Sequence, residues 1–172
     1  MLVGYTFSES ARMALVSARQ EALRLGHPYV GAEHILLGVL VTANGVAATV
    51  LSPADTLRIR SEIERTVRGG SVELPSAGEL PYTSRAKRVL ELAMREALEL
   101  QHEAVGPEHL LLALLREERG IAFAALTGVG LRLEAVRAIV TNRAAGGKSQ
   151  PTSRLRRLLL WIADRFGMLP RG

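Results

Sequence analysis

The chain of 172 residues contains no cysteine, few aromatic residues and no long apolar run. The absence of cysteine excludes disulfides and thiolate metal sites, and it fits a reducing compartment. Aromatic residues make up only 4% of the chain although 48% of it is apolar, so the core must consist of leucine, alanine, valine and isoleucine. That mixture suits helices that pack closely through small side chains.

Signals for export or membrane insertion are also missing. Residues 1–6 show no basic segment followed by an apolar run, which a signal peptide would have. No apolar run reaches the roughly 18 residues that a membrane-spanning helix needs. We therefore expect a soluble, cytoplasmic protein.

The positive charge is concentrated near the C-terminus. The chain has a net charge of +5, and its isoelectric point is about 10.4. Seven basic residues and a single acid, Asp164, follow position 142, so the preceding part is nearly neutral. Nucleic acid is therefore a disfavoured partner, because the main part of the chain shows no repeated basic face or recognition helix.

An internal duplication organises the chain. When the sequence is shifted by 75 residues, positions 7–51 align with positions 82–126, and 18 of the 45 aligned residues are identical. The phrase Gly31-Ala32-Glu33-His34 returns in this alignment as Gly106-Pro107-Glu108-His109.

Each repeat is predicted to form four helices. Apolar residues of the first repeat recur at spacings of three and four, with Ser8 placed as an N-cap and Gly26 as a stop. The first expected helix lies between the Ser8 cap and the Gly26 stop, and the others cover residues 32–42, 46–51, 55–67, 84–101, 107–118, 121–127 and 131–142. The predicted organisation is a first repeat (1–68), a linker (69–81), a second repeat (82–142), a flexible linker (143–152) and a basic tail (153–172).

The adjacent Glu and His of the repeated phrase could indicate a metal site, an acid/base pair or the start of a helix. Neighbouring helical residues point about 100° apart, whereas zinc-binding helices space their ligands at i and i+4, so we expect no metal and no cofactor. His34 and His109 lie in apolar helices, where histidines are commonly hydrogen-bonded members of the core. No pair of groups has catalytic spacing, so we expect no enzyme activity.

A further motif resembles a phosphate-binding loop. The stretch 142–149 ends in Gly-Lys-Ser, but Asn142 replaces the first glycine, and no strand precedes it. We interpret this stretch as linker.

Glu33 and Glu108 are predicted to lie in the first turn of a helix, where a carboxylate interacts favourably with the helix dipole. The same helix start has free backbone donors for an anion, and a carboxylate can hold a guanidinium group through two hydrogen bonds. Such a site would suit a ligand that is anionic at one end and cationic at the other.

The duplicated pattern resembles the N-terminal double-repeat domain of Clp AAA+ unfoldases, most closely the ClpC type. The resemblance covers residues 5–142 and rests on two copies of the Gly-x-Glu-His phrase, preceded by Phe7-Ser8 in one half and Tyr82-Thr83 in the other. It implies an all-α fold of two pseudo-twofold-related four-helix repeats, to which the tail adds an amphipathic helix. It also implies a non-catalytic domain that docks substrates and adaptor proteins onto the unfoldase.

The resemblance further implies two ligand sites. In ClpC-type domains a pocket in each repeat binds phosphoarginine, and carrying this over pairs Glu33 with Ser8 and Glu108 with Thr83. The residue before each glutamate, commonly threonine in the family, is Ala32 or Pro107 in this chain. Cyclic-peptide antibiotics bind related domains at a surface that corresponds to Tyr82 and Lys87.

The AAA+ module of the family does not follow in this sequence. We expect the chain to act as an accessory, adaptor or decoy of the Clp system, with an unfoldase, adaptors or substrates as partners. The tail has arginines around one apolar helical face, which consists of Leu155, Leu158, Leu159, Ile162 and Phe166. This segment could lie on an anionic membrane, dock on a partner or fold back onto its own domain, and the alternative function is a membrane-surface or nucleic-acid-associated protein directed by the tail.

Overall fold

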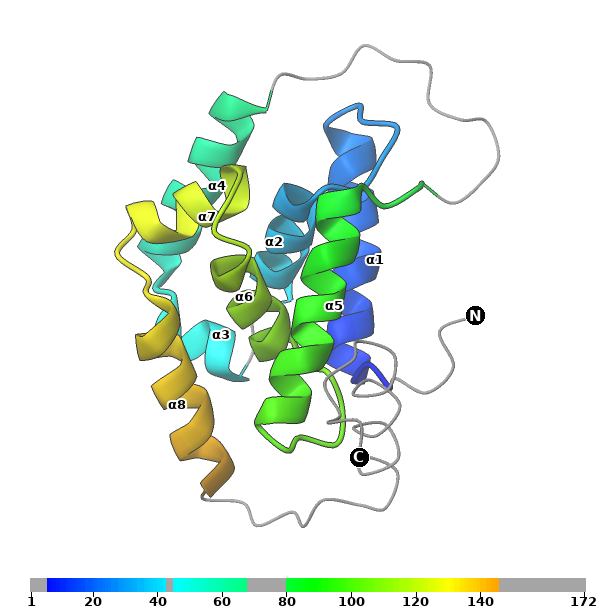
Figure 1. The fold of residues 1–172 in the computed structure, drawn as a ribbon. Coiled ribbons are helices and arrows are strands. Elements are labelled where there is room, and N and C mark those ends of the chain that lie inside the picture. The colour runs from blue at the N-terminus through cyan, green and yellow to red at the C-terminus, as the bar shows by residue number, and fades with distance from the viewer. Residues whose placement is uncertain (1–5, 43–44, 68–79, 146–172) are drawn as a thin grey trace.

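The computed structural model describes residues 6–42, 45–67 and 80–145, which form eight helices and confirm the predicted all-α fold (Figure 1). The helices are α1 (Glu9–Arg24), α2 (Ala32–Val41), α3 (Gly45–Val50), α4 (Pro53–Thr66), α5 (Ser84–Glu99), α6 (Pro107–Arg116), α7 (Ile121–Gly128) and α8 (Leu133–Ala145). Within these ranges the only extended pairings are two isolated β-bridges. The predicted amphipathic tail lies outside the described residues.

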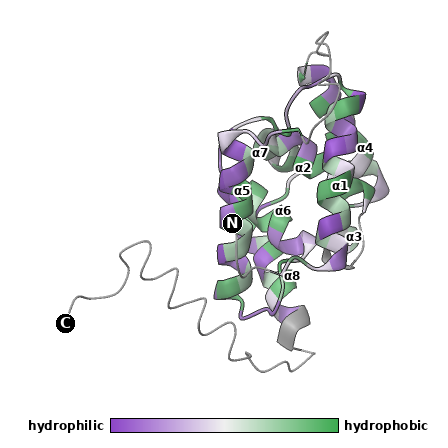
Figure 2. Ribbon diagram, turned by 90° about the vertical axis from the view of Figure 1, so that its right-hand side faces the viewer, coloured by the Kyte–Doolittle hydropathy of each residue, from purple (hydrophilic) through white to green (hydrophobic). Residues whose placement is uncertain are grey.

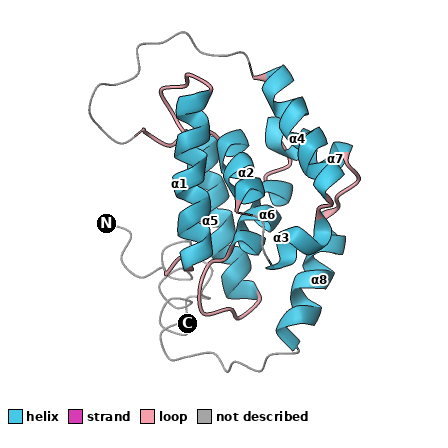
Figure 3. Ribbon diagram, turned by 180° about the vertical axis from the view of Figure 1, so that it is seen from behind, coloured by secondary structure: helices cyan, strands magenta, loops and turns pink. Residues whose placement is uncertain are grey.

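The helices are arranged in three tiers. Helices α2 and α6 form the middle tier, with α1 and α5 on one side and α4, α7 and α8 on the other, and the view from behind shows the same order (Figures 1 and 3). The middle helices are buried over most of their length because their sequences are almost entirely apolar. Helices α1 and α5 are amphipathic, and both contain a mixture of polar and apolar residues (Figure 2).

Small residues let α1 approach α2 very closely. Ala11, Ala14, Ala18 and Ala22 are fully buried along one face of α1. A methyl group on Gly38 of α2 would lie 2.1 Å from the carbonyl oxygen of Ala14, far inside van der Waals contact. Glycine is therefore required at this crossing. The buried apolar residues of both repeats belong to one hydrophobic cluster, so the repeats share a core.

Several helix ends differ slightly from the prediction. Helix α4 starts at Pro53 because the Ser52 side chain accepts from the Asp55 amide while the Asp55 carboxylate accepts from Ser52. Helix α8 continues to Ala145, three residues into the segment predicted as linker. None of the helices formed by the described residues is both long enough and apolar enough to span a membrane.

Candidate functional site

Two β-bridges join the repeats at the starts of their long helices. Phe7 pairs with Val105, and Val30 pairs with Tyr82. The Ser8 amide donates to the Val105 carbonyl over 2.9 Å. In the equivalent position of the other bridge, the Thr83 amide donates to the Val30 carbonyl over 3.0 Å. The start of each long helix therefore lies beside the segment that leads into the Gly-x-Glu-His phrase of the other repeat.

This arrangement changes the pairing that the resemblance implied. The bridges bring Thr83 next to the segment before Glu33, and Ser8 next to the segment before Glu108. The expected pairing joined residues of the same repeat, because sequence periodicity gives no information on contacts between repeats. We call the two places the Glu33 site (Glu33, Tyr82 and Thr83) and the Glu108 site (Glu108, Phe7 and Ser8).

Both glutamates fold back over the glycine of their own phrase. Glu33 and Glu108 lie in the first turns of α2 and α6, and their side chains are 16% and 26% exposed. A methyl group on Gly31 or Gly106 would lie 2.2 Å from the carboxylate. Among the residues that the structure describes, neither carboxylate accepts a hydrogen bond. Each site therefore holds a partly exposed carboxylate that is available to a ligand.

Ser8 and Thr83 are the N-caps of α1 and α5. Each hydroxyl oxygen accepts a hydrogen bond of 3.1 Å, from the amide of Ala11 or Ala86 respectively. The remaining amides of a helix's first turn have no partner within the helix and can bind an anion. The two sites thus contain the two kinds of group that a bipolar ligand needs.

The two histidines of the phrases are fully buried and hydrogen-bonded, as the sequence predicted. His34 Nδ1 accepts from the Gly31 amide over 2.8 Å, and His109 Nδ1 accepts from the Gly106 amide over the same distance. Since this nitrogen accepts, the neutral ring must carry its proton on Nε2. That proton is donated to Nδ1 of His27 over 2.9 Å in the first repeat and to Nδ1 of His102 over 2.7 Å in the second.

Burial keeps these histidines neutral. It lowers the pKa of His34 to about 4, with His27 contributing a smaller effect. It also lowers the pKa of His109 to about 3, again with a smaller effect from the neighbouring histidine. The ligand atoms of each Glu and its two histidines lie within 4.8 Å of one another. Both nitrogens of the buried histidine are nevertheless used in hydrogen bonds, so its ring has no free lone pair for a metal. The hydrogen bond to the glycine amide fixes the start of the helix.

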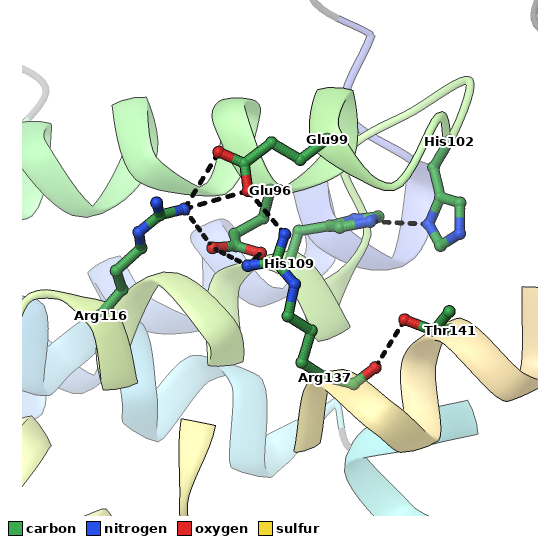
Figure 4. Close-up of polar contacts among 7 residues, drawn as sticks. All are labelled: Glu96, Glu99, His102, His109, Arg116, Arg137 and Thr141. Carbon is green, nitrogen blue, oxygen red and sulfur yellow. Dashed lines mark hydrogen bonds and ion pairs between the residues drawn. The ribbon is translucent and has the colours of Figure 1, made fainter. Parts of the chain in front are cut away.

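Buried ion pairs, which were not predicted from the sequence, anchor the last helix of each repeat. In the second repeat Glu96 is 0% exposed; Arg116 Nη1 lies 2.7 Å from its Oε1, and Arg137 Nη1 lies 3.2 Å from its Oε2 (Figure 4). Both arginines also pair with Glu99. The signal was available in the sequence, because this buried glutamate occupies the same position as Glu21 in the first repeat.

The first repeat has an equivalent network of ion pairs around Glu21. Glu21 accepts hydrogen bonds from Arg60 and Arg24, and Arg24 also contacts Glu64. Burial by itself raises the pKa of Glu21, but the hydrogen bonds from Arg60 and Arg24 outweigh it, so the pKa lies below its ordinary value. The carboxylate therefore stays charged and ties α1 to α4.

The residues expected on the cyclic-peptide surface lie at the start of the second repeat. The Tyr82 ring is half-buried, and the guanidinium carbon of Arg19 lies 5.7 Å from its centroid, within the range of a cation–π contact. Lys87 is exposed on α5, one turn after its cap.

Comparison with known sequences identifies relatives over most of the chain. The sequence matches the family described as Clp repeat (R) N-terminal domain over residues 6–129 and 82–160. It is 43% identical over 155 residues to the chaperone protein ClpC1, chloroplastic, of Arabidopsis thaliana, covering 83% of this chain and 16% of the relative. It is 44% identical over 133 residues to the ATP-dependent Clp protease ATP-binding subunit ClpA homolog of Guillardia theta, covering 76% of this chain and 16% of the relative. The chain thus spans about one sixth of the length of these relatives.

Solved structures show the same fold. The N-terminal domain of the chaperone ClpD from Arabidopsis thaliana superposes with a TM-score of 0.63 at 22% identity, covering 84% of this chain and 97% of that one. The N-terminal domain of Hsp104 from Candida albicans superposes with a TM-score of 0.62 at 19% identity, covering 87% and 97%. The helices, the duplicated phrase and the matched sequences agree, and the chain belongs to the Clp repeat N-terminal domain family.

Proposed function

We propose that this chain is a non-catalytic binding module of the Clp system that docks substrates or adaptor proteins, and that its Gly-x-Glu-His sites bind the phosphoarginine side chain of marked proteins. The observation that carries the proposal is the position of each carboxylate. Glu33 and Glu108 are partly exposed, accept no hydrogen bond within the described residues, and follow a segment that is bonded to the capped start of a helix from the other repeat.

Each part of such a site matches one end of the ligand. A carboxylate can accept two parallel hydrogen bonds from a guanidinium group. A helix start attracts a phosphoryl group through its unpaired amides and its dipole. The buried histidines supply rigidity, because each fixes the glycine amide that lies two residues before its glutamate.

An exposed apolar face on α1 supports protein docking in addition to small-ligand binding. Met13, Val16 and Leu23 are 55%, 51% and 44% exposed, and their spacing places them along one side of the helix. Exposed large apolar side chains that share a face are typical of protein interaction surfaces. Replacing Val16 and Leu23 with serine should weaken capture of a folded adaptor while leaving binding of free phosphoarginine unchanged.

Calorimetric titration of free phosphoarginine tests the proposed ligand. We expect binding to the unmodified chain and none to the double variant Glu33→Gln/Glu108→Gln, which keeps the side-chain shapes but removes both charges. Free arginine and inorganic phosphate serve as ligand controls, and circular dichroism verifies the fold. Equal binding by the unmodified chain and the double variant would contradict the proposal.

We further propose an accessory or decoy role for the chain when it acts apart from an unfoldase. A binding module that is added in trans should compete for marked substrates and for adaptors. The test is degradation of an arginine-phosphorylated protein by a ClpC-type unfoldase with its protease, in the presence of increasing amounts of the chain. We expect degradation to slow as the unmodified chain is added and to slow less when the double variant is added instead. An unchanged rate with the unmodified chain would contradict this role.

A further inference from the structure

The two ligand sites occupy equivalent positions in the fold but differ strongly in charge. The 75-residue shift that relates the repeats maps Ser8 onto Thr83 and Glu33 onto Glu108. The bridges and the hydrogen bonds of the caps are also equivalent. The same ligand would therefore meet an equivalent backbone at both sites. A preference for one site must come from the side chains around it.

The helix that starts at the Glu33 site, α5, is basic over its first turns. Helix α5 has no acid in its first turn, where Arg85 lies, and Lys87 and Arg88 follow. Arg85 is held by Glu117, whose Oε1 lies 3.2 Å from its Nε. Lys87 and Arg88 are exposed, and neither forms an ion pair with another residue that the structure describes. The positive end of the helix dipole is thus reinforced by positive side chains.

A further cation approaches the Glu33 site from α1. The guanidinium of Arg19 lies over the ring of Tyr82, 5.7 Å from its centroid. Tyr82 forms the β-bridge with Val30, three residues before Glu33. This contact holds a positive charge against the same short segment that carries the cap of α5.

The Glu108 site keeps one of these cations, because the exposed Arg12 corresponds to Lys87, but it lacks the others. The helix that starts at this site, α1, has an acid in its first turn. This acid is Glu9, and it corresponds to Ser84. Ser10 corresponds to Arg85, and Met13 corresponds to Arg88. The counterparts of Arg19 and Tyr82 are Met94, which is 8% exposed, and Phe7. A phosphoryl group at this site would meet a carboxylate at the helix start and apolar side chains, with Arg12 as the cation that α1 contributes in its first turns.

We infer that the two sites are not equivalent: the Glu33 site takes the anionic phosphoguanidino group, and the Glu108 site takes it at least about tenfold more weakly. The reason is that Arg19 and Arg88 have methionine counterparts at the Glu108 site, where Glu9 also adds a carboxylate, so fewer charge-assisted contacts to the phosphoryl oxygens are available there. Arg19 is the specificity-determining residue that distinguishes them. This inference rests on the proposed function, since it assumes that phosphoarginine is a ligand of the chain.

The test is a titration of free phosphoarginine into the full chain and single-site variants. We expect one tight site, which Glu33→Gln abolishes and Glu108→Gln leaves intact. Arg19→Met introduces the residue found at the equivalent position of the other repeat, and it should lower the affinity about tenfold and flatten the dependence on salt. Arg19→Lys, which keeps the charge, should retain most of the affinity. Glu9→Ser should strengthen binding at the second site.

The possible failures are distinguishable. Two sites of equal affinity, or an unchanged affinity in Arg19→Met, would overturn the inference and leave the proposed ligand standing. The absence of any binding to the unmodified, folded chain would overturn both the inference and the proposed ligand.

Discussion

The amide of Ser8 donates a hydrogen bond of 2.9 Å to the carbonyl of Val105, and so connects the start of α1 to the chain just before Glu108. The matching bond from Thr83 to Val30 makes the connection in the other direction. Because of this exchange, neither repeat supplies both groups of a proposed site. In each proposed site the carboxylate comes from one repeat and the capped helix start from the other, and the two repeats share a core.

Lowering the pH should destabilise the domain already at pH values well above the range in which carboxylates titrate. The folded-state pKa of His34 is about 4 and that of His109 about 3, against an ordinary value of 6.5. The unfolded chain therefore takes up protons first, and stability is lost as the pH falls below about 6.5. At pH 5 the loss is about 2 kcal/mol for each histidine.

Urea denaturation at pH 7 and pH 5 measures this loss. His34→Gln with His109→Gln is the matched control, because glutamine at this helix position can still accept from the glycine amide but does not titrate. The double variant should show a much smaller difference between the two pH values. An equal pH dependence would mean that the buried histidines are not its cause.

Gly38 should be the most sensitive glycine of the helices. Gly38→Ala places a methyl group 2.1 Å from the Ala14 carbonyl oxygen and forces α1 away from α2, which we expect to cost about 1–3 kcal/mol or more. Gly128→Ala is the matched control, since nothing lies within 4 Å of the added methyl group. That change should be neutral or stabilising by about 0.5–1 kcal/mol. Similar melting temperatures for the two variants would contradict the close helix crossing.

The two repeats end their first helices with different residues in the same backbone conformation. Gly26 has a φ of 70°, and its counterpart Gln101 has a φ of 58°. Left-handed backbone is strained for glutamine and unstrained for glycine, so Gln101→Gly should raise the melting temperature and Gly26→Gln should lower it, each by the equivalent of about 1 kcal/mol. Changes of the same sign in both variants would refute this explanation.

The buried Glu96 should make its arginines costly to remove. Replacing both Arg116 and Arg137 with methionine leaves an uncompensated charge on a fully buried carboxylate, and we expect a loss of about 3–5 kcal/mol in unfolding free energy. Adding Glu96→Gln removes that charge and should recover part of the loss. A triple variant no more stable than the double variant would show that the buried charge is not responsible.

The sequence predicted local structure well and contacts between repeats poorly. The apolar spacing around Ala11 and Ala18, the cap at Ser8 and the stop at Gly26 are local signals, and the structure contains each of them. The burial of His34 also follows from its apolar neighbours. The exchange of helix starts between repeats could not be predicted, because helical periodicity describes one helix at a time. The ion pairs of Glu21 and Glu96 depend on the same kind of contact, with partners up to 41 residues away.

Chemical-shift mapping by NMR tests the central claim, that one ligand contacts both repeats. Free phosphoarginine should be titrated into the full chain while the backbone amide signals are followed. We predict that Gly31 and Glu33 of the first repeat shift together with Thr83 and Ser84 of the second, and that Glu33→Gln suppresses all four changes. If the signals of Glu33 shifted together with those of Ser8, while Thr83 stayed unaffected, the site would be confined to one repeat, and the claim of a site shared between the repeats would be wrong.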